Sequence, residues 1–162
     1  MAPTSNPLAR YAIALGSNRR GRHGRPEDEL AAALIAIGGV RAVSRVMITA
    51  SVGPSSRRFA NQAAIIDSDE PPPELLARLK AIEHAFGRRP GRRWGARVID
   101  LDIILWSGGA WASPGLVIPH AAFRGRRFVL APLAQIAADW RDPLTGRTIR
   151  QLCAIDRKRR PS

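Results

Sequence analysis

The amino-acid sequence predicts an α+β domain of the ferredoxin-like type, with a βαββαβ core and a mostly antiparallel sheet. Short runs rich in Val, Ile and Leu alternate with segments whose apolar residues recur at helical spacing. The order of these segments is strand, helix, strand, strand, helix, strand, followed by a C-terminal extension. This topology places the first and last core strands side by side at the centre of the sheet.

The first half of the core contains a strand, a helix and a second strand. Residues 11–15 form a short apolar strand that leads into the turn 16–18, a turn with free backbone donors that suits an anion. A helix begins near Pro26, has three acidic residues in its positive first turn, and ends at Gly38-Gly39. Alternation over 40–49 predicts one continuous strand.

The second half begins with a strand at 59–66. A helix follows from about Glu74, with an apolar stripe at helical spacing, and ends at Gly87. The central strand occupies 98–105 and is followed by a hairpin turn at 107–109. Beyond it we expect a short apolar piece at 116–118, a helix with apolar positions from 130 to 140, a loop at 142–147 and a last short element at 149–155.

Composition bounds the class of protein. The chain has 162 residues, of which 45% are hydrophobic, and this suits one soluble domain over 11–156 with a flexible leader 1–10 and a basic tail 157–162. A single cysteine excludes an internal disulfide. No apolar run is long enough to span a membrane, and the leader lacks a secretory h-region. We therefore expect a cytoplasmic monomer.

The net charge of +13 leaves a second function class open. A ferredoxin-like RNA-binding domain has the same fold and a high pI, and residues 124–131 superficially resemble an RNA-stacking signature. However, Arg126 and Ala131 occupy positions where that signature has stacking rings. The basic clusters at 19–25, 88–97 and 124–127 border Gly or Pro turns, as expected of loops around a small polyanion. We therefore expect no nucleic-acid partner.

Two carboxylates lie inside the central strand. Asp100 and Asp102 are two residues apart, so they point to the same side, about 6–7 Å apart at Cα. The same face carries Val98 and Ile104, and the other carries Ile99, Leu101, Ile103 and Leu105. Two like charges on a half-apolar surface call for a cation, and Mg²⁺ with a phosphate substrate is the usual solution. Taken alone, Asp-x-Asp is also compatible with two solvated residues on an edge strand.

Three other polar residues have functional and structural readings. Asn61, inside a strand and beside Phe59, is either a strand-edge cap or an amide that pairs with a heterocycle. Glu83 taken alone is a solvated neighbour of arginines more often than a catalytic group. His120, beside the basic turn 124–127, is a reasonable phosphate contact.

Four motifs together resemble one family. Ala-Leu-Gly-Ser-Asn at 14–18, Phe-Ala-Asn-Gln-Ala at 59–63, Arg-Trp-Gly-Ala-Arg-Val-Ile-Asp-Leu-Asp at 93–102 and Pro-His at 119–120 are similar to hydroxymethyldihydropterin pyrophosphokinase of folate synthesis. The resemblance runs from residue 11 to about 155. Members of this family transfer the terminal diphosphate of ATP to the hydroxymethyl group of a reduced pterin and release AMP. A homologue that has lost activity is disfavoured, because every charged position of the motif is present.

The resemblance also implies roles for individual residues. Asp100 and Asp102 would hold two Mg²⁺ ions on the ATP phosphates, and Arg88 and Arg97 would be catalytic arginines of a mobile loop. The implied ATP contacts are Glu83, Arg88, Trp94, Arg97, Ile118, His120 and Arg126. The implied pterin contacts are Thr49, Val52, Phe59, Asn61 and Phe128. Phosphoryl-type transfer asks the protein mainly for positioning and charge stabilisation, which such a set supplies.

Overall fold

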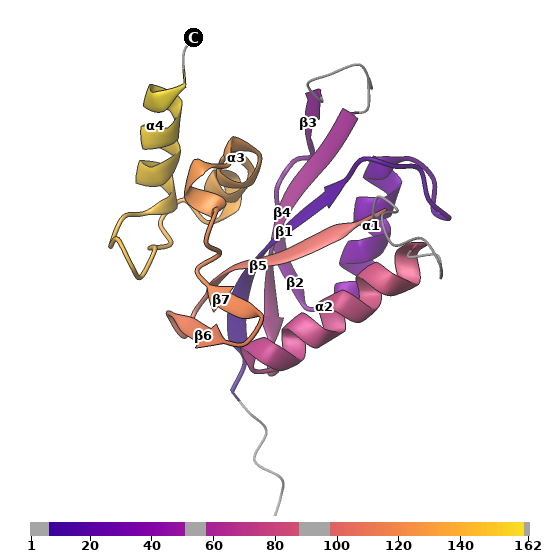
Figure 1. The fold of residues 1–162 in the computed structure, drawn as a ribbon, viewed down its shortest axis with the longest axis horizontal. Helices are drawn as coiled ribbons and strands as arrows, with labels where there is room; N and C mark the ends of the chain where they lie inside the picture. Colours follow the sequence, from indigo (N-terminus) through magenta and orange to yellow (C-terminus); the bar gives the residue numbers. More distant parts are fainter. Residues whose placement is uncertain (1–6, 51–57, 88–97, 161–162) are drawn as a thin grey trace, which may run out of the picture.

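A five-stranded antiparallel sheet forms the centre of the computed structural model, which describes residues 7–50, 58–87 and 98–160 (Figure 1). The strand order is β2-β4-β1-β5, and β3 also pairs with β4. The strands are β1 (Ala9–Ser17), β2 (Val40–Val43), β3 (Met47–Ala50), β4 (Arg58–Ser68) and β5 (Asp100–Trp106). The expected pairing of β1 with β5 is present. The expectation that both lie at the centre is wrong for β5, because it ends the strand order within the described chain.

Residues 40–49 form two strands, so the prediction of one continuous strand is also wrong. The break is at Ser44, whose backbone N–H donates to the Ala63 carbonyl at 2.9 Å. The Ser44 hydroxyl accepts the Ala63 N–H, also at 2.9 Å. A side chain thus replaces the backbone carbonyl that a continuous ladder would use, and β2 and β3 pair with β4 on either side of this point.

Two helices cover the first face of the sheet. They are α1 (Pro26–Ile37) and α2 (Pro72–Gly87), which lie together on one side of the strands (Figure 1). Their apolar stripes, including Leu30, Leu75 and Leu79, pack on alternate strand residues such as Ile13 and Leu101 in one buried cluster. Each such leucine is fully buried, and burial of one leucine side chain contributes about 1.5–3 kcal/mol. This cluster is the main core.

The second face is covered over only part of its length. Helices α3 (Arg127–Ile136) and α4 (Ile149–Arg159) pack there on the opposite side from α1 and α2 (Figure 1). Leu130 and Leu133 of α3 and Leu152 of α4 meet Ile65 and Ile104 from the strands. The strand residues nearer the start of β5 lie beyond these helices, which leaves room for a site.

A bulge in β5 alters the expected alternation of its side chains. Ile13 pairs with Ile103, but the preceding residue Ala12 pairs with Leu105, so one residue of β5 is extra. As a result Leu105 lies in the second-face cluster together with Ile104. The expectation that Leu105 shares a face with Leu101 is therefore wrong, whereas the alternation from 99 to 104 is as predicted.

The C-terminal extension is more helical than expected. After the small hairpin β6 (Trp111–Ser113) and β7 (Leu116–Ile118), the 3-10 turn Phe123–Gly125 leads into α3, which ends at Ile136 rather than near 140. Helix α4 continues to Arg159, through the first three residues of the expected basic tail.

At the N-terminal end, β1 begins at Ala9, inside the expected leader, because its pairing with β4 continues to Ser68. In the ranges given above, no helix is both long and apolar enough to cross a membrane.

A buried ion pair within this extension joins the loop before α4 to the 3-10 turn before α3. Asp142 is fully buried and accepts two hydrogen bonds from Arg124, at 2.6 and 2.8 Å. It also accepts hydrogen bonds from the Thr145 hydroxyl and the Leu144 N–H. Burial alone would raise the pKa of Asp142, but these hydrogen bonds outweigh it and lower that pKa to about 2.

Candidate active site

A cavity of about 470 Å³ opens on the second face of the sheet, beside the start of α3. Volumes of this size are typical of sites for small molecules. Four strands and one helix contribute to its wall: β1, β3, β4, β5 and α3. The lining residues are Ala14, Leu15, Gly16, Ser17, Asn18, Thr49, Phe59, Asn61, Asp100, Asp102, Arg126, Phe128 and Val129.

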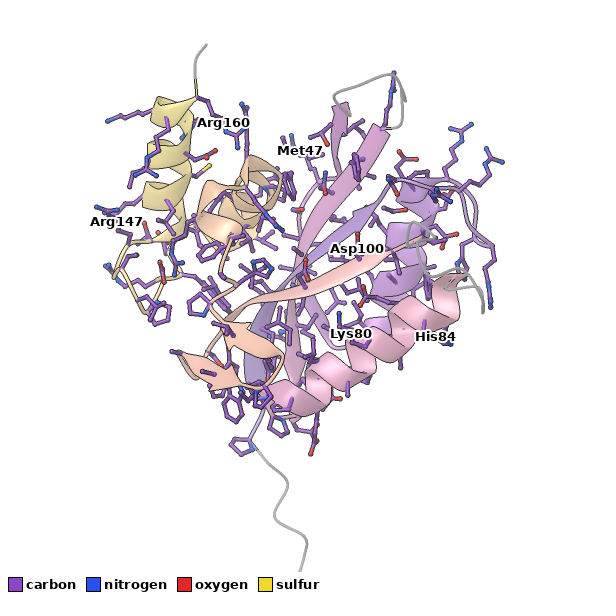
Figure 2. All side chains as sticks on the ribbon, viewed as in Figure 1. Met47, Lys80, His84, Asp100, Arg147 and Arg160 are labelled. Atoms are coloured by element: carbon purple, nitrogen blue, oxygen red, sulfur yellow. The ribbon has the colours of Figure 1, made fainter. Side chains whose placement is uncertain are left out.

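Strand register brings distant residues together at this cavity. Gly16 of β1 pairs with Asn61 of β4 on one side and with Asp100 of β5 on the other. Met47 of β3 then pairs with Asn61, so a single row crosses four strands from Asp100 to Met47, both labelled in Figure 2. Asp102 lies beside Ala14 in the next row on the same face. Asp100 and Asp102 thus form one acidic wall, as their spacing predicts.

Gly16 gives the row the space that it needs. A Cβ at this position would lie 3.3 Å from the Asn61 side-chain oxygen, which is closer than ordinary van der Waals contact. Only a glycine lets the Asn61 amide lie against β1 without displacement. Together with Ser17 and Asn18, it forms the rim where β1 ends.

Asn61 is the polar group at the base of the cavity. It is 7% exposed, and its side-chain N–H donates to the Thr49 hydroxyl over a long 3.4 Å. A buried carboxamide with one weak partner among the described residues retains capacity for a ligand that has both a donor and an acceptor. Two aromatic rings line the same cavity, Phe59 from β4 and Phe128 from α3. Their exposed fractions, 37% and 40%, leave area for stacking.

A positive group faces the acidic wall. Arg126 precedes α3 and lines the cavity, with its guanidinium carbon 5.8 Å from the centre of the Phe128 ring. Since α3 begins at the next residue, the positive end of its dipole lies at the same place. The cavity thus has two carboxylates on one wall and a cation on another, which is the charge arrangement for a metal-bound phosphate.

The carboxylates fit a hard divalent cation. Among the residues that the structure describes, no group of three or more His, Cys, Asp or Glu side chains gathers into a closed metal site. Of the described lining residues, Asp100 and Asp102 are the two that supply carboxylate oxygens, and both lie on one open wall. Mg²⁺ is usually held in this way, by one or two carboxylates with the remaining positions filled by water and substrate phosphates.

Three residues predicted to contact ATP do not line this cavity. Glu83 is buried on the first face, where it accepts the Leu101 N–H at 3.4 Å and lies 3.6 Å from the Lys80 ammonium. The ring of His120 accepts the Ala122 N–H at 3.1 Å through Nδ1. Ile118 is 1% exposed and belongs to the main core. Their ATP contacts stay predictions.

Four further predicted residues lie outside the described parts of the chain. They are Val52, Arg88, Trp94 and Arg97. The sequence, in turn, predicts no role for the lining residues Ala14, Leu15 and Val129, and only a general one, as an anion-binding turn, for 16–18. The position of that turn directly after the first strand was the one sequence signal that could have placed it at the cavity. The other lining residues are brought there by strand register, which the spacing of residues along the sequence does not predict.

A family-wide sequence profile matches most of this chain. The profile is that of 7,8-dihydro-6-hydroxymethylpterin-pyrophosphokinase (HPPK), and it matches residues 12–138. A Pseudomonas aeruginosa protein named 2-amino-4-hydroxy-6-hydroxymethyldihydropteridine pyrophosphokinase is 39% identical over 153 residues, which is 91% of each chain. A Synechocystis protein of the same name is 44% identical over 100 residues, which is 62% of this chain and 51% of that protein. These matches favour the pyrophosphokinase prediction over the RNA-binding alternative.

Solved structures agree at the level of the fold. A Plasmodium falciparum HPPK-DHPS crystal structure with STZ-DHP matches 94% of this chain with a TM-score of 0.71, at 13% sequence identity. The chain spans about half the length of that protein and of the Synechocystis relative, at 46% and 51%. The shared architecture is a mixture of helices with an antiparallel sheet. From the profile and the P. aeruginosa relative, the chain belongs to the 7,8-dihydro-6-hydroxymethylpterin-pyrophosphokinase family.

Proposed function

We propose that this protein transfers the terminal diphosphate of ATP to the hydroxymethyl group of a reduced pterin and releases AMP. One observation carries the proposal: a buried amide, two exposed aromatic rings and a pair of carboxylates line the same cavity. A flat heterocycle needs the first two, and a polyphosphate with its metal needs the third. Relatives named as pyrophosphokinases of this pterin support the same reaction.

The pterin half of the site is assigned to the base of the cavity. The Asn61 carboxamide, which has both N–H donors and an acceptor oxygen, pairs with the polar edge of the ring. Phe59 and Phe128 hold the ring faces, and Thr49 orients the amide through its hydroxyl. Val52 is proposed as a further pterin contact from the family resemblance alone. Because these groups fix the ring in one orientation, the hydroxymethyl group is directed toward the acidic wall.

The phosphate half is assigned to the acidic wall and to Arg126. Asp100 and Asp102 would hold two Mg²⁺ ions, which when bound neutralise phosphate charge and make the attacking hydroxyl more acidic. Among the described lining residues, only these two carry carboxylates, and we assign the hydroxyl proton to Asp102, which is the less exposed. Arg126 offsets charge that develops on the phosphates during transfer.

The remaining ATP contacts are proposed from the family resemblance. Arg88 and Arg97 are the catalytic arginines in this proposal, with Trp94 beside them. Glu83, Ile118 and His120 complete the ATP contacts, and this requires ATP to extend beyond the described cavity around the start of β5. We also infer a ferredoxin-like core, which the strand order β2-β4-β1-β5 with α1 and α2 on one face supports. A cytoplasmic monomer without nucleic acid is the corresponding expectation from composition.

The test is the dependence of ATP consumption on the pterin. Purified protein with Mg²⁺ and ATP should consume ATP only when 6-hydroxymethyl-7,8-dihydropterin is present. The matched control is 6-methyl-7,8-dihydropterin, which has the same ring system but no acceptor oxygen. Equal consumption with the methyl compound, or stimulation by RNA in place of the pterin, would overturn the proposal.

A further inference from the structure

A second cavity, of about 380 Å³, lies next to the candidate active site. Asn18 lines both cavities and marks the boundary between them. The second cavity is formed by the loop before α1, the first residues of α1 and the start of β4. Its polar lining consists of Asn18, Arg20, Arg25, Glu27 and Arg58. Three arginines therefore line one concave surface that the candidate active site does not use.

The three arginines have no carboxylate partner in the parts of the chain described above. The ion pairs there involve other arginines, such as Arg78 with Glu70. The next acidic residue after Glu27 is Asp28. Its carboxylate accepts the Arg25 backbone N–H at 2.9 Å. Three like charges close together repel one another, and a bound anion offsets that repulsion.

The loop that carries Arg20 and Arg25 is fixed by hydrogen bonds to a buried residue of α1 and by hydrogen bonds within the loop. Glu29 is fully buried and accepts the His23 N–H at 2.8 Å, and its other oxygen lies 2.8 Å from the His23 ring nitrogen. Gly21 and Gly24 exchange two backbone hydrogen bonds across the loop, at 3.0 and 3.3 Å. This small hairpin brings its two ends, and therefore both arginines, to the mouth of the cavity.

We propose that Arg20, Arg25 and Arg58 bind a phosphate dianion at a site separate from the Asp100/Asp102 cavity. Guanidinium groups match phosphate oxygens in pairs, and the first turn of α1 adds its positive dipole end. The three arginines and the single Glu27 carboxylate give a local charge of about +2, which matches a phosphate group of about −2. The dianion is either free phosphate or the phosphate group of a nucleoside monophosphate.

Binding can be measured without the candidate active site. In EDTA and at constant ionic strength, inorganic phosphate is titrated into the protein and followed by calorimetry. Under these conditions Asp100 and Asp102 carry no metal and repel phosphate, and the part of the signal that is lost on substitution of a lining arginine reports the second cavity. Arg20→Gln and Arg58→Gln should each weaken binding about tenfold. The matched control is Arg150→Gln, which removes one exposed arginine outside the cavity and should leave binding unchanged.

A variant that binds phosphate more tightly than the unmodified protein cannot owe its effect to misfolding. Glu27→Gln removes the one carboxylate of the cavity and should tighten phosphate binding several-fold. Glu74→Gln makes the same charge change in the first turn of α2 and should have no effect. AMP titrated in the same way distinguishes the sources: tighter binding than phosphate, still weakened by Arg20→Gln, indicates a nucleotide, and equal binding indicates free phosphate. The proposal is overturned if phosphate affinity is the same in Arg20→Gln and Arg58→Gln as in the unmodified protein, or if Arg150→Gln weakens it equally.

Discussion

Removal of the Asn61 amide should weaken pterin binding and leave ATP binding unchanged. The side chain is 7% exposed, and among the described residues its one hydrogen bond, to the Thr49 hydroxyl, is long at 3.4 Å. Asn61→Ala therefore removes little from the folded protein but leaves buried polar atoms of the heterocycle unpaired. That penalty is about 1–3 kcal/mol, which corresponds to a pterin Kd raised about 5- to 150-fold.

Calorimetry with the pterin, and separately with a non-hydrolysable ATP analogue and Mg²⁺, measures both affinities. Gln62→Ala is the matched control, because this neighbouring amide donates to the Ser44 carbonyl at 2.8 Å and does not line the cavity. Asn61→Asp keeps the shape of the side chain but replaces its donor, and should weaken binding as Asn61→Ala does. A pterin Kd within about twofold of the unmodified value for Asn61→Ala would place the ring elsewhere.

Three further predictions concern the acidic wall, the close contact at β1 and the buried ion pair. Asp102→Asn should lower turnover about 100-fold or more without lowering the melting temperature, because charge stabilisation by a bound metal is worth several kcal/mol; near-normal steady-state rates at saturating Mg²⁺ would contradict the assignment. Gly16→Ala should weaken pterin binding less than loss of the amide does, because a Cβ 3.3 Å from the Asn61 oxygen requires a shift of only a few tenths of an ångström; unchanged pterin affinity by calorimetry would show that the amide position is not critical. The lowered pKa of Asp142, about 2 against an ordinary 3.8, contributes about 2 kcal/mol to folding; this is complete above pH about 4 and is lost as the pH falls toward 2. Arg124→Met should cost about 3–5 kcal/mol at neutral pH by leaving the carboxylate buried and unpaired, and urea unfolding between pH 7 and 2 that is the same with and without Arg124 would contradict this.

The parts of the fold that sequence predicts are those with strong local periodicity. The stripe of α2, the acidic start of α1 and the apolar run of β5 each give the right element. The sequence-based predictions are wrong where a contact between distant residues determines the local structure. Ser44 breaks a strand through its bond to Ala63, and the bulge opposite Ala12 moves Leu105 to the other face. Neither effect has a signature within a few residues of its position.

In the candidate site too, local sequence patterns predict some features and long-range contacts determine the others. The two carboxylates on one face come directly from their spacing, and the family resemblance points to the amide and the rings. The contribution of Gly16 depends on its register with Asn61 and Asp100, which only the assembled sheet provides. The second cavity could not be predicted for the same reason: Arg20 and Arg58 are far apart in the sequence, and the pairing of β1 with β4 brings the loop after β1 to the start of β4.

The nucleotide product tests the central claim most directly. A kinase that moves one phosphoryl group leaves ADP, whereas transfer of a diphosphate requires attack at the β-phosphorus of ATP and leaves AMP. Separation of the nucleotides by ion-exchange chromatography, after a single incubation with Mg²⁺, ATP and 6-hydroxymethyl-7,8-dihydropterin, identifies the product. We predict AMP in amounts equal to the pterin consumed. ADP as the main product, or AMP formed equally without the pterin, would contradict the account.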